Sequence, residues 1–192
     1  MSAFTKGIVN YNLNEFYRST GCSTHLSRYR KSVDERYSSY RLGFANFIGK
    51  SVIDIGCFTG FYSCLMAPYA DHVLGIDTNR PALVHANKMR ALFNCENVTF
   101  KHKSAFTLSS EYLRANSITG LFIHKTMSPD SKWTDKRQKA FWDLMKEQMD
   151  VIVASSTPPG SGKVDILRPV FAKDDRFKII EIENHLVAIV RV

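Results

Sequence analysis

The chain lacks long apolar runs, and this excludes one class of protein at once. None of its hydrophobic stretches approaches the ~20 residues that a membrane-spanning helix needs. The first residues, MSAFTKGIVNYNLNEF, also lack the charged region and apolar core of a signal peptide. We therefore expect an intracellular, cytoplasmic protein with no membrane partner.

Cysteine is scarce as well, which argues against a disulfide scaffold and against a metal centre. The four cysteines form no CxxC pair and no cluster with histidine at the spacing of zinc ligands. The six histidines show no cluster either. We expect free, buried thiols and no metal ion at Cys22, Cys57, Cys64 and Cys95.

The chain has 192 residues, 44% of them hydrophobic, which is enough for one domain with a hydrophobic core. It contains no internal repeat and no low-complexity tract, so we expect residues 1–192 to form a single domain. Its net charge of +8 is uneven, because residues 1–50 carry eight Lys/Arg against three Asp/Glu and five of the eight tyrosines. This segment suits an anionic partner such as nucleic acid; the alternative is a solvated face that only aids solubility.

From residue 51 onward, apolar β-branched runs alternate with helical patterns. The strands expected from these runs cover residues 51–55, 73–76, 97–101, 118–124 and 151–155, and the helices cover 61–66, 81–93 and 134–148. Strands separated by helices predict a mostly parallel sheet. Two further strands, 177–183 and 186–192, flank a tight turn and predict a terminal hairpin that adds one antiparallel strand. Before the sheet, residues 32–47 suit one or two helices.

The most informative stretch is the loop after the first expected strand, Asp54-Ile55-Gly56-Cys57-Phe58-Thr59-Gly60. An acid ends the strand, Gly56 permits a tight turn, and Gly60 permits close approach of the backbone to a ligand. The next strand ends in Asp77, and this spacing fits one strand-helix-strand unit. A nucleotide-type ligand is therefore expected here, but the G-x-G-x-x-G pattern of dinucleotide sites is missing.

The sequence of this glycine loop and the order of the expected strands and helices resemble those of the class I S-adenosylmethionine-dependent methyltransferases over roughly residues 50–192. The family motif is acid-x-Gly-x-Gly-x-Gly, in which Phe58 here replaces the middle glycine. The resemblance implies an α/β three-layer sandwich with a seven-stranded, mostly parallel sheet that ends in an antiparallel hairpin. Residues 1–50 would precede this core, residues 51–192, as a helical basic extension or substrate lid.

The resemblance also implies a cofactor, S-adenosyl-L-methionine, which leaves as S-adenosyl-L-homocysteine. Asp54 would lie near its methionine amino group, and Asp77 would accept from both ribose hydroxyls unless it merely caps the following helix. Ser104 stands where many members have an acid for the adenine amino group, and Phe106 either stacks on adenine or belongs to the core. The expected cofactor-binding set is Asp54, Gly56, Cys57, Phe58, Gly60, Phe61, Asp77, Thr78, Ser104, Ala105 and Phe106.

The end of the fourth strand, where this fold usually places its chemistry, reads His124-Lys125-Thr126-Met127-Ser128-Pro129-Asp130. It matches neither the acid-or-Asn-Pro-Pro-aromatic motif of base-amino methyltransferases nor the Lys-Asp-Lys-Glu set of ribose 2′-O enzymes. No cysteine lies there for a covalent mechanism. His124 and Lys125 are the catalytic candidates, and His124 is either a general base or a residue that closes the pocket.

The function expected from these features is methylation of RNA, with guanine N7 of a cap-like end, as in mRNA capping, as its sharpest form. N7 carries no proton, so it needs no base. RNA would contact Arg28, Arg30, Lys31, Arg36, Tyr37 and Arg41, with Tyr29, Tyr37 or Tyr40 stacking on a base. The alternatives are a small-molecule methyltransferase, in which residues 30–36 hold an acidic metabolite, and a non-catalytic module that kept the fold.

Overall fold

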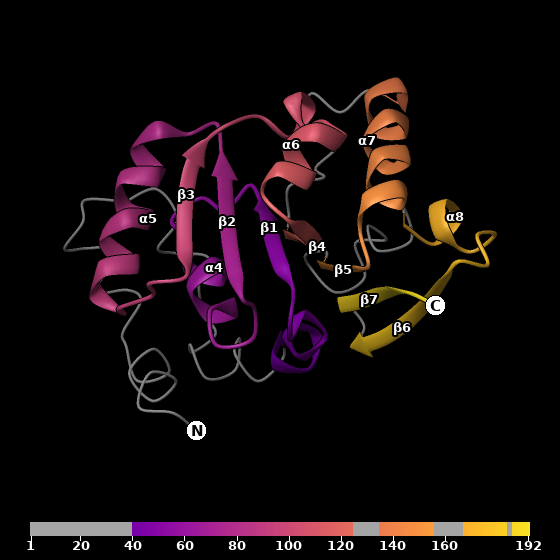
Figure 1. Ribbon diagram of the computed structural model, residues 1–192, viewed down its shortest axis with the longest axis horizontal. Helices are drawn as coiled ribbons and strands as arrows, with labels where there is room; N and C mark the ends of the chain where they lie inside the picture. The colour runs from indigo at the N-terminus through magenta and orange to yellow at the C-terminus, as the bar shows by residue number, and fades with distance from the viewer. Residues whose placement is uncertain (1–39, 125–134, 156–166, 184–185) are drawn as a thin grey trace.

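The computed structural model describes residues 40–124, 135–155, 167–183 and 186–192, and these build one seven-stranded sheet in the order β3-β2-β1-β4-β5-β7-β6 (Figure 1). The strands are β1 Ser51–Ile55, β2 His72–Asp77, β3 Val98–His102, β4 Ile118–His124, β5 Val151–Ser155, β6 Phe177–Glu183 and β7 Leu186–Arg191. Strands β1 to β5 pair in parallel, whereas β7 pairs antiparallel with both β5 and β6. The predicted parallel sheet with a terminal hairpin is confirmed.

Helices cover both faces of this sheet, which makes the molecule a three-layer sandwich (Figure 1). The helices are α4 Phe61–Met66, α5 Arg80–Leu92, α6 Ser110–Ala115, α7 Asp135–Gln148 and α8 Leu167–Phe171, with 3-10 turns η2 Ala45–Phe47 and η3 Ala105–Thr107. None of the helices in the described ranges is both long and apolar enough to cross a bilayer.

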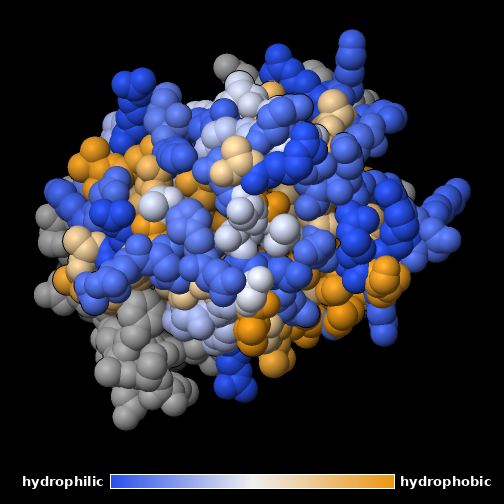
Figure 2. Space-filling model, viewed as in Figure 1, coloured by the Kyte–Doolittle hydropathy of each residue, from blue (hydrophilic) through white to orange (hydrophobic). Residues whose placement is uncertain are grey.

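Two apolar cores fill the spaces between sheet and helices, because alternate strand residues point to opposite faces. Val52 packs with α4, α5 and the segment around Phe44, whereas Ile53 packs with α6, α7 and α8. Strands β1, β2, β4, β5 and β7 are largely buried, so they read as nearly unbroken apolar runs in the sequence. Figure 2 shows hydrophilic side chains over most of one surface, with apolar side chains in smaller groups among them.

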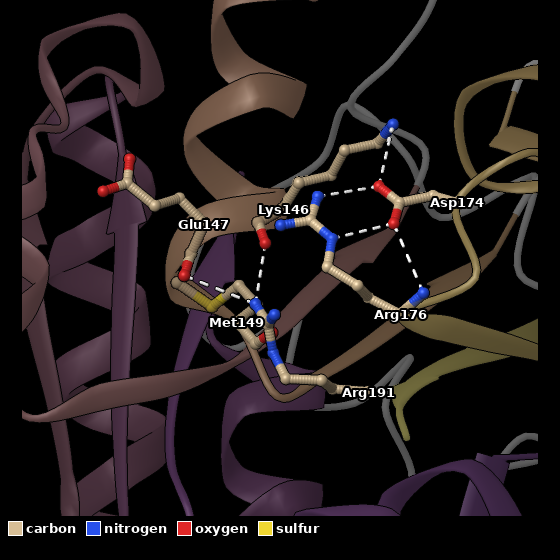
Figure 3. A network of polar contacts seen from close by, with 6 residues as sticks. All are labelled: Lys146, Glu147, Met149, Asp174, Arg176 and Arg191. Atoms are coloured by element: carbon tan, nitrogen blue, oxygen red, sulfur yellow. Dashed lines mark hydrogen bonds and ion pairs between the residues drawn. The ribbon is translucent and has the colours of Figure 1, made fainter.

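A polar network ties the end of α7 to the last strand (Figure 3). The guanidinium of Arg191, on β7, donates to the carbonyls of Lys146 and Met149, at 2.7 and 3.0 Å. These are carbonyls that the end of a helix leaves without partners inside the helix. Beside it, Asp174 accepts from Arg176 and pairs with Lys146. The network fixes α7, one wall of the site described next, against the sheet.

Candidate active site

The loop between β1 and α4 is tied to the end of β2 by its backbone. The amides of Gly56 and Cys57 both donate to the Ile76 carbonyl, at 2.9 and 3.1 Å, and the Gly60 amide donates to the Cys57 carbonyl. Gly56 has φ +70°, a left-handed conformation that glycine adopts without steric cost. The predicted turn at Gly56 is therefore present, and it brings the loop beside Asp77.

Phe58 is the departure from the glycine pattern, and it keeps the conformation that glycine would have. Its φ is +49°, in the left-handed region that costs a bulky residue about 1 kcal/mol. Its amide donates to Oδ2 of Asp77 at 2.9 Å, while the Asn79 amide donates to Oδ1 at 2.7 Å. The side chain of Asn79 caps α5, so the helix-cap alternative for Asp77 is wrong. Asp77 instead organises the loop.

Gly60 serves packing as well as the turn. It has φ +75°, and a Cβ atom placed on it would lie 2.4 Å from Cζ of Phe100 and 3.0 Å from Cβ of Ala86. Phe100 comes from β3 and Ala86 from α5. The sequence suggested only close approach to a ligand; the structure shows that the missing side chain also makes room for Phe100.

Asp54 is a carboxyl group buried beneath this loop, with 2% of its surface exposed. The Ser63 hydroxyl, on α4, donates to its Oδ2 at 2.5 Å. Burial raises the pKa of Asp54 from 3.8 to about 7; the Ser63 hydrogen bond lowers the pKa in part, and the charge of Asp77 raises it further. Asp54 can therefore gain or lose a proton near neutral pH.

This raised pKa makes the stability of the ligand-free protein depend on pH. The folded carboxyl keeps its proton between about pH 4 and 7, where the unfolded chain has lost it, so stability falls as pH rises through that window. The amide that replaces the carboxyl in Asp54→Asn does not titrate. As the pH rises from 5 to 8, we therefore expect the unfolding free energy of Asp54→Asn to rise by roughly 3 kcal/mol relative to that of the unchanged protein. Urea unfolding at both pH values measures this. Ser63→Ala, which removes the hydrogen bond that lowers the pKa of Asp54, should extend the pH range of this stability loss upward. A stability difference between Asp54→Asn and the unchanged protein that did not vary with pH would contradict the raised pKa of Asp54.

A cavity of about 840 Å³ opens at the carboxyl ends of β1, β2 and β3, and we call it the nucleotide cavity. Ligands of such α/β sheets bind at this edge. Its lining residues are Ile55, Gly56, Ile76, Asp77, Thr78, Lys103, Ser104, Ala105, Phe106, Thr107, Leu108, Arg137, Ala140, Phe141 and Leu144. Six predicted cofactor residues are thus brought together: Gly56, Asp77, Thr78, Ser104, Ala105 and Phe106.

The other predicted cofactor residues are not among those that line the nucleotide cavity. Asp54, Cys57 and Phe61 are buried, and Phe58 and Gly60 shape the loop. The wall from α7, with Arg137, was missed by sequence reasoning. The helical spacing of Phe141 and Leu144 predicts that one face of this helix is buried, but it does not predict that the helix lines a cavity.

Phe106 and Ser104 form the far end of the nucleotide cavity. The Ser104 side chain accepts from the Phe106 amide at 3.3 Å and caps η3. Phe106 is 37% exposed, and the Arg137 guanidinium lies 5.2 Å from its ring centroid. The core alternative for Phe106 is therefore wrong, since its ring forms part of the cavity wall.

Two cations line the nucleotide cavity close to Ser104, the position at which many relatives are expected to have an acid. One is Arg137; the other is Lys103, whose Nζ lies 4.3 Å from the Tyr112 ring centroid. Lys101 also lies over that ring, at 5.7 Å. This end of the cavity is electropositive and attracts anionic groups.

His124 ends β4 in a polar cluster with residues from two other segments. Nδ1 of its ring lies 3.0 Å from the Tyr40 hydroxyl and in short contact with Oγ of Ser155, and the Tyr40 hydroxyl donates to Ser155 at 2.9 Å. The Tyr62 ring packs on His124, with centroids 4.5 Å apart. Tyr40 is 3% exposed, so the expectation that it stacks on a substrate base is wrong.

Most predicted substrate contacts lie outside the described residues. Besides Tyr40, only Arg41 among them is placed, and it is exposed on the helical segment 40–44. The residues that lie outside the described ranges are the predicted substrate contacts Arg28, Arg30, Lys31, Arg36 and Tyr37 and the second catalytic candidate, Lys125. Across the part of the chain that the structure describes, no group of three His, Cys, Asp or Glu side chains is placed to hold a metal ion.

The nucleotide cavity fits an adenosine-containing ligand. Its walls are largely apolar, Phe106 offers an aromatic face, and Asp77 offers a carboxylate at the end of β2. Each carboxylate oxygen has a second lone pair, so Asp77 can hold the loop and still accept from two ribose hydroxyls.

Comparison with known proteins agrees with this geometry. A family model described as a methyltransferase domain matches residues 47–181. No curated protein sequence matches the chain. Among solved structures, the N-methyltransferase NodS from Bradyrhizobium japonicum WM9, in complex with S-adenosyl-L-homocysteine, has 13% identity and a TM-score of 0.66 over 92% of this chain and 97% of its own.

An rRNA methylase from Streptococcus thermophilus has 14% identity and a TM-score of 0.56, over 85% of this chain and 98% of its own. At these identities the structural likeness shows the fold alone, while the family model covers most of the chain. The interpretation as a non-catalytic module is not retained. With its seven-stranded sheet, terminal hairpin and glycine loop, the chain belongs to the class I S-adenosylmethionine-dependent methyltransferases, enzymes whose cofactor is S-adenosylmethionine.

Proposed function

We propose that this enzyme methylates RNA. The observation that carries the proposal is the pair of cations, Lys103 and Arg137, in the wall of the nucleotide cavity. S-adenosylmethionine has no phosphate to bind them, so they suit the phosphates of a second, anionic ligand. The net charge of +8, concentrated in residues 1–50, supports the same partner.

In this proposal the nucleotide cavity holds the cofactor, which supplies a methyl group activated on a sulfonium sulfur. Asp77 accepts from the ribose hydroxyls, the buried Asp54 lies near the ammonium group, and Phe106 stacks on the adenine ring. The fixed loop orients the cofactor relative to the acceptor, and orientation with exclusion of water is most of what methyl transfer needs from a protein.

The acceptor strand would run from the cations of the nucleotide cavity toward the end of β4. Arg41 would then bind phosphate, together with Arg28, Arg30, Lys31, Arg36 and Tyr37 of the N-terminal segment. Guanine N7 of a cap-like end makes one specific prediction: turnover should survive replacement of His124, because N7 carries no proton to remove.

A small acidic metabolite is the second candidate acceptor. It is favoured by the partly buried setting of His124 beside the rings of Tyr40 and Tyr62, which suits a compact molecule. In that case the same cations would bind its acidic group. One labelled cofactor offered separately to total RNA and to a metabolite extract distinguishes the two.

The salt dependence of RNA binding tests the proposal directly. We expect Lys103→Ala/Arg137→Ala to bind RNA about 10-fold more weakly near 0.1 M salt and to reduce the slope of log K against log salt by about 1.5. Lys173→Ala/Lys178→Ala makes the same charge change at exposed sites near β6 and is the matched control. Calorimetry with S-adenosylhomocysteine checks that cofactor binding is retained. A flat salt response, or label entering only metabolites, would refute the RNA proposal.

A further inference from the structure

Two lysines at the end of β3 lie over the same aromatic ring. Lys101 and Lys103 occupy alternate positions along the chain, so both side chains leave the strand on one face of the sheet. The Nζ atoms of Lys101 and Lys103 lie 5.7 and 4.3 Å from the centroid of the Tyr112 ring, on α6. Because β3 is an edge strand (Figure 1), the two ammonium groups lie at an edge of the sheet.

The ring of Tyr112 is held in place from both sides of its backbone. The Ser109 hydroxyl accepts from the Tyr112 amide at 3.2 Å, and the Asn116 side chain donates to the Tyr112 carbonyl at 2.7 Å. Nζ of Lys101 lies 3.5 Å from Oδ1 of the same Asn116. The Tyr112 hydroxyl is enclosed and has no hydrogen-bond partner, so Tyr112 acts here through its ring.

The charges of the two lysines are not neutralised. Within the described ranges neither ammonium group pairs with a carboxylate, and Glu111, the acid of α6, pairs with Arg114 instead, at 3.7 Å. A cation–π contact attracts an ammonium group but leaves its charge in place. Two like charges over one ring repel each other, and a bound anion would offset that repulsion. The pair is therefore suited to anionic groups.

The two lysines connect the outer surface with the nucleotide cavity. Lys103 lines that cavity, and its amide donates to the Asp77 carbonyl at 3.1 Å. Lys101 is exposed and is not among the residues of the cavity wall. A ligand that contacts both lysines must therefore extend beyond the cavity. This suits the repeated phosphates of a nucleic acid better than the single acidic group of a compact metabolite.

We infer that Lys101 and Lys103 bind two phosphates of an RNA acceptor that reaches the cofactor across the β3 edge, and that Tyr112 is their positioning residue. The acceptor is then an oligonucleotide that carries at least two phosphates. The inference rests on the proposed methylation of RNA, to which it adds the side from which the strand arrives and a minimum length. From Lys103 the strand continues past Arg137 toward the end of β4.

The length of the ligand tests this path. With the full-length enzyme saturated with S-adenosylhomocysteine, we expect Lys101→Ala to bind a single-stranded oligoribonucleotide about 3-fold more weakly near 0.1 M salt. The slope of log K against log salt should fall by about 0.7. A dinucleotide, which has one phosphodiester, should bind Lys101→Ala as tightly as the unchanged enzyme, whereas Lys103→Ala should weaken both ligands. Fluorescence anisotropy measures these affinities.

Two changes at Tyr112 separate positioning from charge. Tyr112→Phe keeps the ring and loses only a hydroxyl that has no partner, so it should bind the oligoribonucleotide within twofold of the unchanged enzyme. Tyr112→Leu removes the ring and should weaken binding about 5-fold. In a Lys101→Ala/Lys103→Ala background, Tyr112→Leu should weaken binding no further, whereas a purely structural role for Tyr112 would still lower the affinity there.

The matched control is Lys88→Ala, which makes the same charge change at an exposed site on α5, on the opposite face of the sheet. Calorimetry should show unchanged S-adenosylhomocysteine binding in Lys101→Ala and in Lys88→Ala. Equal effects of these two changes on salt-dependent RNA binding would overturn the inference while leaving the RNA proposal standing. An unchanged enzyme whose affinity for oligoribonucleotides does not depend on salt would refute the RNA proposal, and the inference with it.

Discussion

Replacing Gly60 by alanine is expected to cost about 4 kcal/mol of unfolding free energy, a large fraction of the roughly 5–15 kcal/mol that stabilises a typical domain. The added Cβ would lie 2.4 and 2.9 Å from two ring atoms of Phe100, a residue of β3. In a close-packed core this forces the ring or the loop to move. The left-handed φ of +75° adds strain of about 1 kcal/mol. Urea unfolding followed by circular dichroism measures the loss.

Gly49 provides the matched control, because it separates backbone strain from collision. It has nearly the same conformation, φ +72°, but nothing lies within 4 Å of an added Cβ. Gly49→Ala should therefore cost only the strain, about 1 kcal/mol. Combining Gly60→Ala with Phe100→Ala should destabilise less than the sum of the two single changes, since the collision disappears. Equal losses for Gly60→Ala and Gly49→Ala would contradict the steric explanation.

The central strands could be predicted because they are buried on both faces, and the main helices because one face of each is buried against the sheet. β1, β4 and β5 were predicted with the bounds that the structure shows, and so was α4. A strand between two helical layers has no solvent face, so its apolar run ends where the strand ends. The antiparallel hairpin of β6 and β7 followed from a two-residue turn between two such runs.

Other features depend on contacts that no local pattern encodes. Helices α6 and α8 have six and five residues, too few for a helical period to emerge, whereas the equally short α4 was predicted from the glycine loop before it and Pro68 after it. The α7 wall of the nucleotide cavity and the meeting of Tyr40 with His124 and Ser155 arise only when distant segments pack together. Phe58 reads as a departure from a glycine motif, and only the fold shows that it keeps the left-handed conformation of that position.

Removing the Asp77 carboxylate is expected to weaken S-adenosylhomocysteine binding about 1000-fold. Asp77 has two tasks in the proposed complex: it holds the Phe58 and Asn79 amides, at 2.9 and 2.7 Å, and it accepts from the ribose hydroxyls. Asp77→Ala loses both charge-assisted hydrogen bonds to the ligand and releases a loop residue from a strained conformation. Isothermal calorimetry measures the change in affinity.

Two further variants show which task dominates. Asp71→Ala removes an exposed carboxylate just before β2, at the opposite end of that strand, and should leave affinity unchanged. Adding Phe58→Gly to Asp77→Ala should restore loop stability, because glycine needs no anchor to keep φ near +50°. If ribose binding is the main task, this second change restores melting temperature but little affinity. Recovery of most of the affinity would show that Asp77 acts through the loop, and undiminished binding by Asp77→Ala would contradict its place in the cofactor site.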